Sequence, residues 1–111
     1  MKEIEDLHRK AMDLAERADT ADAPTPLLRQ AFDLERAAAL LASERGVLQP
    51  SLGILYRSAA SLALECGLFA EAKSLVDQAL AFKEAMPEDL VAELIELREE
   101  LTVRTSTRSA P

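Results

Sequence analysis

Apolar residues recur every three or four positions along most of the chain, and short segments rich in proline, glycine or small polar residues interrupt the pattern. Residues with this spacing share one face of an α-helix, so each uninterrupted stretch predicts a helix with one apolar stripe. Runs of Val, Ile or Thr that would favour strands are missing. The pattern predicts an all-α protein of about five helices, with stripes over residues 4–18, 27–42, 52–66, 69–82 and 90–101.

The segments between the stripes contain residues that begin or end helices. Residues 19–26 include two prolines and several small polar residues, which predicts a loop, and Thr25 is expected to cap the helix that follows. Gly46 and Gly67 suit the left-handed backbone that ends a helix. Only Gly67 and Leu68 separate the third stripe from the fourth, and so short a connection forces two helices to pack antiparallel.

The length of 111 residues suits one domain, and a composition that is 49% hydrophobic and 30% charged is typical of a chain that folds. We expect residues 1–101 to form the helical domain. Residues 102–111 are mostly Thr, Ser and Arg, which predicts a flexible C-terminal tail.

Residues 54–87 combine a large residue early in one helix, small residues where two helices would cross, a glycine turn and a further alanine. These positions are Tyr56, Ala60, Ala63, Gly67, Phe69, Glu71, Ala72 and Ala79. The pattern resembles the tetratricopeptide repeat (TPR), with its Gly-x-aromatic-x-Glu-Ala turn. A shift by the TPR period of 34 residues carries Tyr56 onto Leu90 and Gly67 onto Leu101, so the fifth helix resembles the start of a further unit.

The resemblance covers roughly residues 4–101 and implies antiparallel helix pairs stacked in a right-handed superhelix. In TPR proteins the first helix of each pair lines a concave groove that receives a peptide or a helix. The resemblance thus implies a non-catalytic adaptor or scaffold whose partner is another protein or peptide. The implied groove residues are His8, Met12, Glu16, Arg57, Ser61, Leu64, Glu65, Val91, Ile95 and Arg98. The alternative for each of them is an ordinary surface residue.

Two other functions stay open. The fifth helix has no mate, and residues 37–42 are apolar on every side, so a homodimer or another homo-oligomer is one alternative. Val91 and Ile95 would then meet a second copy. The other alternative is a regulatory subunit with a small-ligand pocket in the crease between the helices of a pair.

The net charge of −7 comes from 20 acidic and 13 basic residues. An acidic surface repels phosphate, which argues against nucleic acid and an anionic membrane as partners, and it suits a basic or amphipathic protein segment. The alternative is that the charge only maintains solubility. No apolar stretch approaches 18 residues and no signal peptide is recognisable, so a cytoplasmic location is expected.

The sequence contains no pattern that indicates an enzyme, a metal site or a cofactor. His8 is the single histidine and has no partner in the sequence that would mark a catalytic triad or a zinc site. Cys66, the single cysteine, lies on an apolar stripe without basic neighbours, which predicts a buried and unreactive thiol. We therefore expect neither catalysis nor a bound cofactor.

Overall fold

The computed structural model describes residues 2–109, and side chains within residues 2–106. This part of the chain contains five α-helices, a short 3₁₀ turn and no strand, which confirms the predicted all-α class. The elements are α1 (Lys2–Ala18), α2 (Thr25–Glu44), α3 (Ser51–Glu65), α4 (Phe69–Leu80), η1 (Lys83–Ala85) and α5 (Glu88–Ser109).

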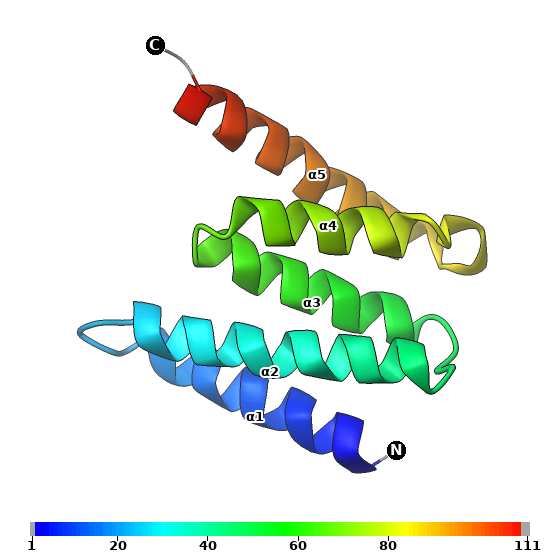
Figure 1. Ribbon diagram of the computed structural model, residues 1–111, viewed down its shortest axis with the longest axis horizontal. Coiled ribbons are helices and arrows are strands. Elements are labelled where there is room, and N and C mark those ends of the chain that lie inside the picture. Colours follow the sequence, from blue (N-terminus) through cyan, green and yellow to red (C-terminus); the bar gives the residue numbers. More distant parts are fainter. Residues whose placement is uncertain (1, 110–111) are drawn as a thin grey trace.

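The helices run back and forth, and each packs against the next along the chain (Figure 1). Helix α5 also contacts α3, so α3 is covered by α2, α4 and α5. The result is a slab of 44 × 33 × 21 Å. The loops at residues 45–50 and 81–87 lie at one end of this slab, and the loops at residues 19–24 and 66–68 lie at the other.

Glycines in left-handed conformation end α2 and α3, as the sequence predicts. Gly46 has a φ of +70° and Gly67 a φ of +75°. After Gly67, the amide of Leu68 donates back to the carbonyl of Ala63 at 2.8 Å, which is the bond that closes a Schellman turn. This turn reverses the chain between α3 and α4 within a few residues, so the two helices pack as an antiparallel pair.

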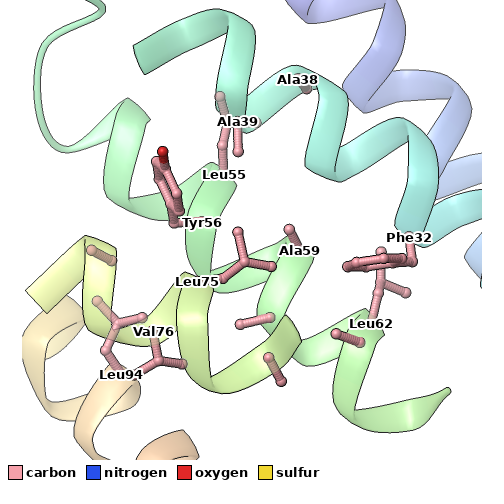
Figure 2. Packing of buried hydrophobic residues seen from close by; sticks show 14 of the residues in the cluster. Phe32, Ala38, Ala39, Leu55, Tyr56, Ala59, Leu62, Leu75, Val76 and Leu94 are labelled. Carbon is pink, nitrogen blue, oxygen red and sulfur yellow. The ribbon is translucent and has the colours of Figure 1, made fainter. Parts of the chain in front are cut away.

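Alanines occupy the places where helices cross, and a few large side chains fill the space between them (Figure 2). Small residues let two helix backbones approach closely, which explains why alanines dominate the buried set. The fully buried alanines are Ala11, Ala31, Ala38, Ala39, Ala42, Ala59, Ala60, Ala63 and Ala72. Phe32, Val76 and Leu94 are the large apolar residues that lose all their solvent contact.

Three details of the predicted helix boundaries are wrong. Thr25 does not cap α2, because the helix begins at Thr25 itself and the preceding Pro24 offers no side-chain hydrogen bond. Phe82 does not continue the stripe of α4, because that helix ends at Leu80 and Phe82 is 61% exposed. Helix α5 continues to Ser109, so residues 102–109 are helical where the sequence predicts a tail.

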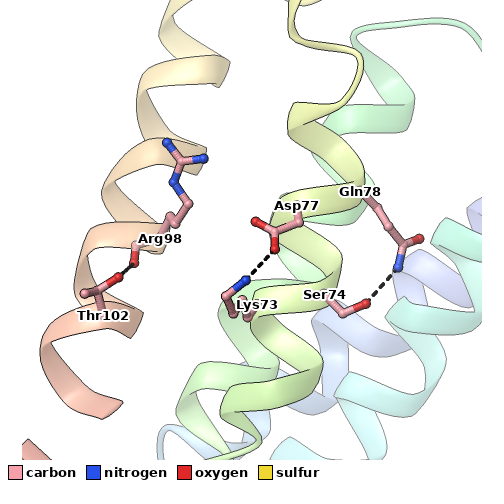
Figure 3. Close-up of polar contacts among 6 residues, drawn as sticks. All are labelled: Lys73, Ser74, Asp77, Gln78, Arg98 and Thr102. Carbon is pink, nitrogen blue, oxygen red and sulfur yellow. Dashed lines mark hydrogen bonds and ion pairs between the residues drawn. The ribbon is translucent and has the colours of Figure 1, made fainter. Parts of the chain in front are cut away.

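The extension of α5 has a local cause. The hydroxyl of Thr102 donates to the carbonyl of Arg98 at 3.0 Å (Figure 3), and the hydroxyl of Thr105 donates to the carbonyl of Leu101 at 2.8 Å. Threonine and serine side chains can thus be accommodated in a helix by bonding to the preceding turn. Leu101 is buried and anchors this part of α5. Residues 110–111 of the predicted tail lie outside the described residues.

Candidate binding groove

A groove of about 360 Å³ lies between α3 and α5. Helix α3 contributes Arg57 and Ser61, which are four positions apart and therefore share one face of the helix. Helix α5 contributes Glu93, Glu96, Leu97 and Glu100, which are three or four positions apart except for the adjacent pair Glu96 and Leu97. Leu97 is half-buried and packs against the core, so it provides the apolar part of the groove.

The charge of this groove is predominantly negative. Nη1 of Arg57 donates to Oε2 of Glu93, and this ion pair joins the two walls. Oε2 of Glu100 lies 3.9 Å from Nη2 of Arg104 on the next turn of α5. Such an ion pair between exposed groups is weak. Glu96 has no ion-pair partner within the described part of the chain. One arginine therefore faces three glutamates, and Glu96, together with the weakly paired Glu100, can accept a cationic group.

The residues that the sequence assigns to one groove lie in different places on α5. Arg57 and Ser61 line the α3–α5 groove, but Ile95 and Arg98 face α4. There they border a hollow of about 240 Å³ with Asp77, Leu80 and Lys83. Val91 is half-buried and packs against the core. Ile95 and Arg98 therefore do not share a groove with Arg57 and Ser61.

The predicted groove residues on α1 and at the end of α3 also lie in different environments. Leu64 is buried in the core, so it cannot face a ligand. The side chain of His8 is directed to Glu35 of α2. Met12 is half-buried against the core, whereas Glu16 and Glu65 are exposed. Partial burial raises the pKa of Glu65, and the negative charge of Asp19 raises it further.

Sequence reasoning missed the acidic wall of the groove. Glu93, Glu96 and Glu100 follow one another at intervals of three and four residues on α5, beside the leucine stripe. This spacing is a recognisable signal of a charged helix face. The sequence could not show that this face, rather than the side carrying Ile95 and Arg98, lies opposite Arg57, because that depends on how α5 is rotated against α3.

A hollow of about 410 Å³ between α1 and α2 is larger than the α3–α5 groove. Its charged residues are Arg9, Lys10, Asp13 and Arg17, all from α1. Arg9 pairs with Asp6 at 2.7 Å and Arg17 with Asp13 at 3.7 Å, so two of its three cations already have acidic partners on their own helix. The α3–α5 groove differs because its charged residues come from both helices and because the Arg57–Glu93 ion pair joins its two walls.

Within residues 2–109, no helix is both long enough and apolar enough to cross a bilayer. The described part of the chain also contains no group of three or more His, Cys, Asp or Glu residues placed to hold a metal ion. Comparisons with protein-family models, with curated proteins and with solved structures find no match for this chain.

Proposed function

We propose that this chain is a non-catalytic interaction module that binds a basic, amphipathic segment of another protein in the α3–α5 groove. The observation that carries this proposal is the unbalanced charge of the groove, where three glutamates face a single arginine. A lysine or arginine of a partner would find carboxylate acceptors at Glu96 and Glu100 without breaking an internal ion pair across the groove. An apolar residue of the partner would contact Leu97.

The charge of the whole chain supports the same partner. A net charge of −7 attracts a cationic segment from a distance and raises its association rate at low ionic strength. Recognition of an amphipathic helix by a helical groove usually depends on a few apolar anchors with charged groups at the rim. The α3–α5 groove has this composition on a small scale, with Leu97 beside the glutamates.

The resemblance to TPR proteins is a second line of support. In that family the first helices of successive pairs face the ligand, and in this chain those helices are α1, α3 and α5. The antiparallel α3–α4 pair, its turn at Gly67 and the buried Ala60, Ala63 and Ala72 agree with the repeat pattern. Membership of the family, right-handed superhelical stacking and a cytoplasmic location remain our predictions.

A second copy of the chain is a less favoured occupant of the groove. The homodimer hypothesis requires Val91 and Ile95 to be exposed so that they can meet a second copy. Both are half-buried, Val91 against the core and Ile95 beside Leu80 of α4, so α5 does not present them as a bare apolar face. An acidic groove is also a poor match for an equally acidic copy.

The proposal can be tested with two fluorescent amphipathic peptides that share their leucines and carry either lysine or glutamate at every polar position. We expect the lysine peptide to bind and the glutamate peptide not to bind, as measured by fluorescence anisotropy at two salt concentrations. Glu96→Lys should weaken binding by about tenfold, because reversing a charge in the groove costs on the order of 1.4 kcal/mol.

Glu99→Lys is the matched control. Glu99 is exposed on the same helix and does not line the groove, and its replacement by lysine changes the net charge by the same amount. Its effect on affinity should be less than about twofold, since an exposed charge outside the contact acts only through solvent. Equal losses for the two variants would show that the peptide is attracted by the overall charge and not by the groove. Light scattering on the same variants would reveal a dimer that depends on Glu96.

A further inference from the structure

Glu35 of α2 is a charged residue that folding removes completely from water. Its side chain is 0% exposed. Among the described residues, Glu35 is the single charged residue that is buried. An isolated carboxylate in such a place would be costly, so buried charges are normally paired and hydrogen-bonded. The neighbours of Glu35 therefore decide in which protonation state the protein is stable.

Two other helices supply those neighbours. Nδ1 of His8, from α1, lies 2.7 Å from Oε2 of Glu35 and 3.0 Å from Oε1. Ser58, from α3, also lies near the carboxyl group and favours its charged form. The side chain of His8 is 39% exposed, so its ring is in contact with solvent, whereas Glu35 is not. His8, Glu35 and Ser58 form a polar cluster that joins three helices.

The charged side chains that adjoin the cluster in the sequence are occupied elsewhere or exposed. On α1, Arg9 pairs with Asp6. On α2, Asp33 pairs with Arg29, and Arg36 is exposed. On α3, Arg57 pairs with Glu93. Among the described residues, His8 is the charged group that acts on Glu35.

The geometry allows the cluster to hold one shared proton in two ways. A charged imidazolium can donate from Nδ1 to the carboxylate, or a neutral imidazole can accept at Nδ1 from the carboxylic acid. Both arrangements leave the buried region without net charge. When the shared proton is lost, the carboxylate of Glu35 remains charged beside a neutral ring, and its charge is buried without compensation.

We propose that His8, Glu35 and Ser58 form a pH-sensitive switch that holds α1 on α2 while the shared proton is present and releases α1 as the pH rises. Helix α1 suits this role because it lies at one end of the array and packs mainly against α2. Its buried residues Ile4, Ala11 and Ala18 would then become accessible without unfolding of α3, α4 and α5. Local opening of a terminal helix is a common mode of partial unfolding.

The direction of the pH effect follows from Glu35. Burial raises the pKa of Glu35 above its ordinary value of 4.5, and the charge and hydrogen bond of His8, together with the nearby hydroxyl of Ser58, offset part of that rise. In the unfolded chain the carboxyl group of Glu35 loses its proton above about pH 4.5, whereas in the folded protein this group retains its proton to higher pH. The stabilisation is therefore complete below the unfolded pKa and is lost as the pH rises through the folded pKa.

Native-state hydrogen exchange between about pH 5 and about pH 9 tests the switch, after correction for the intrinsic pH dependence of exchange. In the unaltered protein, the opening equilibrium of α1 should increase with pH by up to about tenfold per pH unit, the limit for one proton. Amides of α4 and α5 should not share this increase. Glu35→Gln retains the volume and can donate to His8 but cannot titrate, so its α1 opening should not depend on pH.

Arg9→Gln is the matched control, because it removes an exposed ion pair from the same helix. This variant should retain the pH dependence of the unaltered protein. The proposal is overturned if Glu35→Gln retains that dependence, or if α1 of the unaltered protein opens no more with pH than α4 does. If Glu35→Gln does not fold, the ¹³C chemical shift of the Glu35 carboxyl group and the ¹⁵N shifts of the His8 ring in the unaltered protein decide the question. A charged carboxylate beside a neutral ring while α1 remains closed would refute the switch.

Discussion

A Cβ atom built on Gly53 of α3 would lie only 2.6 Å from Sδ of Met86, in the segment that leads into α5. The same Cβ would lie 2.8 Å from Oε1 of Gln49 and 2.9 Å from Cδ2 of Leu90. Oε1 of Gln49 also accepts a hydrogen bond from the amide of Gly53 at 2.8 Å. Gly53 is therefore the place where the loop before α3 and the loop before α5 meet, and its lack of a side chain permits that contact.

Gly53→Ala should destabilise the protein by about 1–2 kcal/mol. Alanine is the better helix former by roughly 0.5–1 kcal/mol, but displacement of three packed side-chain ends outweighs this gain. Urea unfolding monitored by circular dichroism measures the difference. The contact with Met86 can be isolated in a double-mutant cycle, in which Met86→Ala should make Gly53→Ala less harmful. Additive effects of the two substitutions would contradict the proposed contact.

Ala72→Leu should destabilise strongly, by about 1–3 kcal/mol, because Ala72 is fully buried at the crossing of α4 with α3 and the added atoms have no space. Ala70 is on the same helix and is exposed, so Ala70→Leu should change the free energy of unfolding by less than about 0.5 kcal/mol. Thermal unfolding of both variants compares the two sites. Similar losses of Tm would show that Ala72 is not the residue at which α4 packs against α3.

The contrast between Gly67 and Glu35 shows what the sequence could and could not predict. A glycine after an apolar stripe reports a helix end through its own conformational freedom, so Gly46 and Gly67 were predictable from local sequence. Glu35 appeared to be one acid among 20. Its burial depends on His8 and Ser58, which meet it only when three helices pack, and no local pattern signals that contact.

The lining of the candidate groove also could be predicted only in part, because it too depends on how the helices pack. The spacing of Arg57 and Ser61 placed them correctly on one face of α3. On α5, the leucine stripe predicted which face is buried, but two polar flanks lie on either side of it. One flank carries Glu96 and Glu100, and the other carries Arg98. Which flank lies beside α3 follows from the crossing of α5 over the α3–α4 pair, and this is a property of tertiary packing.

Cys66 should react slowly with an aromatic disulfide reagent at neutral pH, although it is only half-buried and not fully buried as its stripe suggests. Burial raises the pKa of its thiol, and the nearby positive charge of Arg29 offsets part of the rise. Each unit of such a rise lowers the reactive thiolate fraction about tenfold.

Arg29→Gln should slow the labelling of Cys66 further, because the charge that lowers its pKa is removed while the opposing charges of Glu65 and Asp33 remain. Lys10→Gln, at an exposed position of α1, is the control and should leave the rate unchanged. Absorbance of the released thiolate measures the rate, with the urea-unfolded protein as the reference. A native rate equal to the unfolded rate would contradict the raised pKa.

Val91→Ser combined with Ile95→Ser should reduce stability without changing the oligomeric state. Val91 is half-buried against the core and Ile95 lies in the hollow beside Leu80, so both contribute to the docking of α5. Full burial of such a side chain stabilises by about 1.5–3 kcal/mol, and half-burial therefore gives about 1 kcal/mol for each. Ala92→Ser, at an exposed position between them, should cost much less. Urea unfolding measures the stability and light scattering the mass of the particle. A variant that retains its stability but dissociates from a dimer would instead show that these two residues meet a second copy, because a side chain that packs within its own chain cannot be changed without loss of folding free energy.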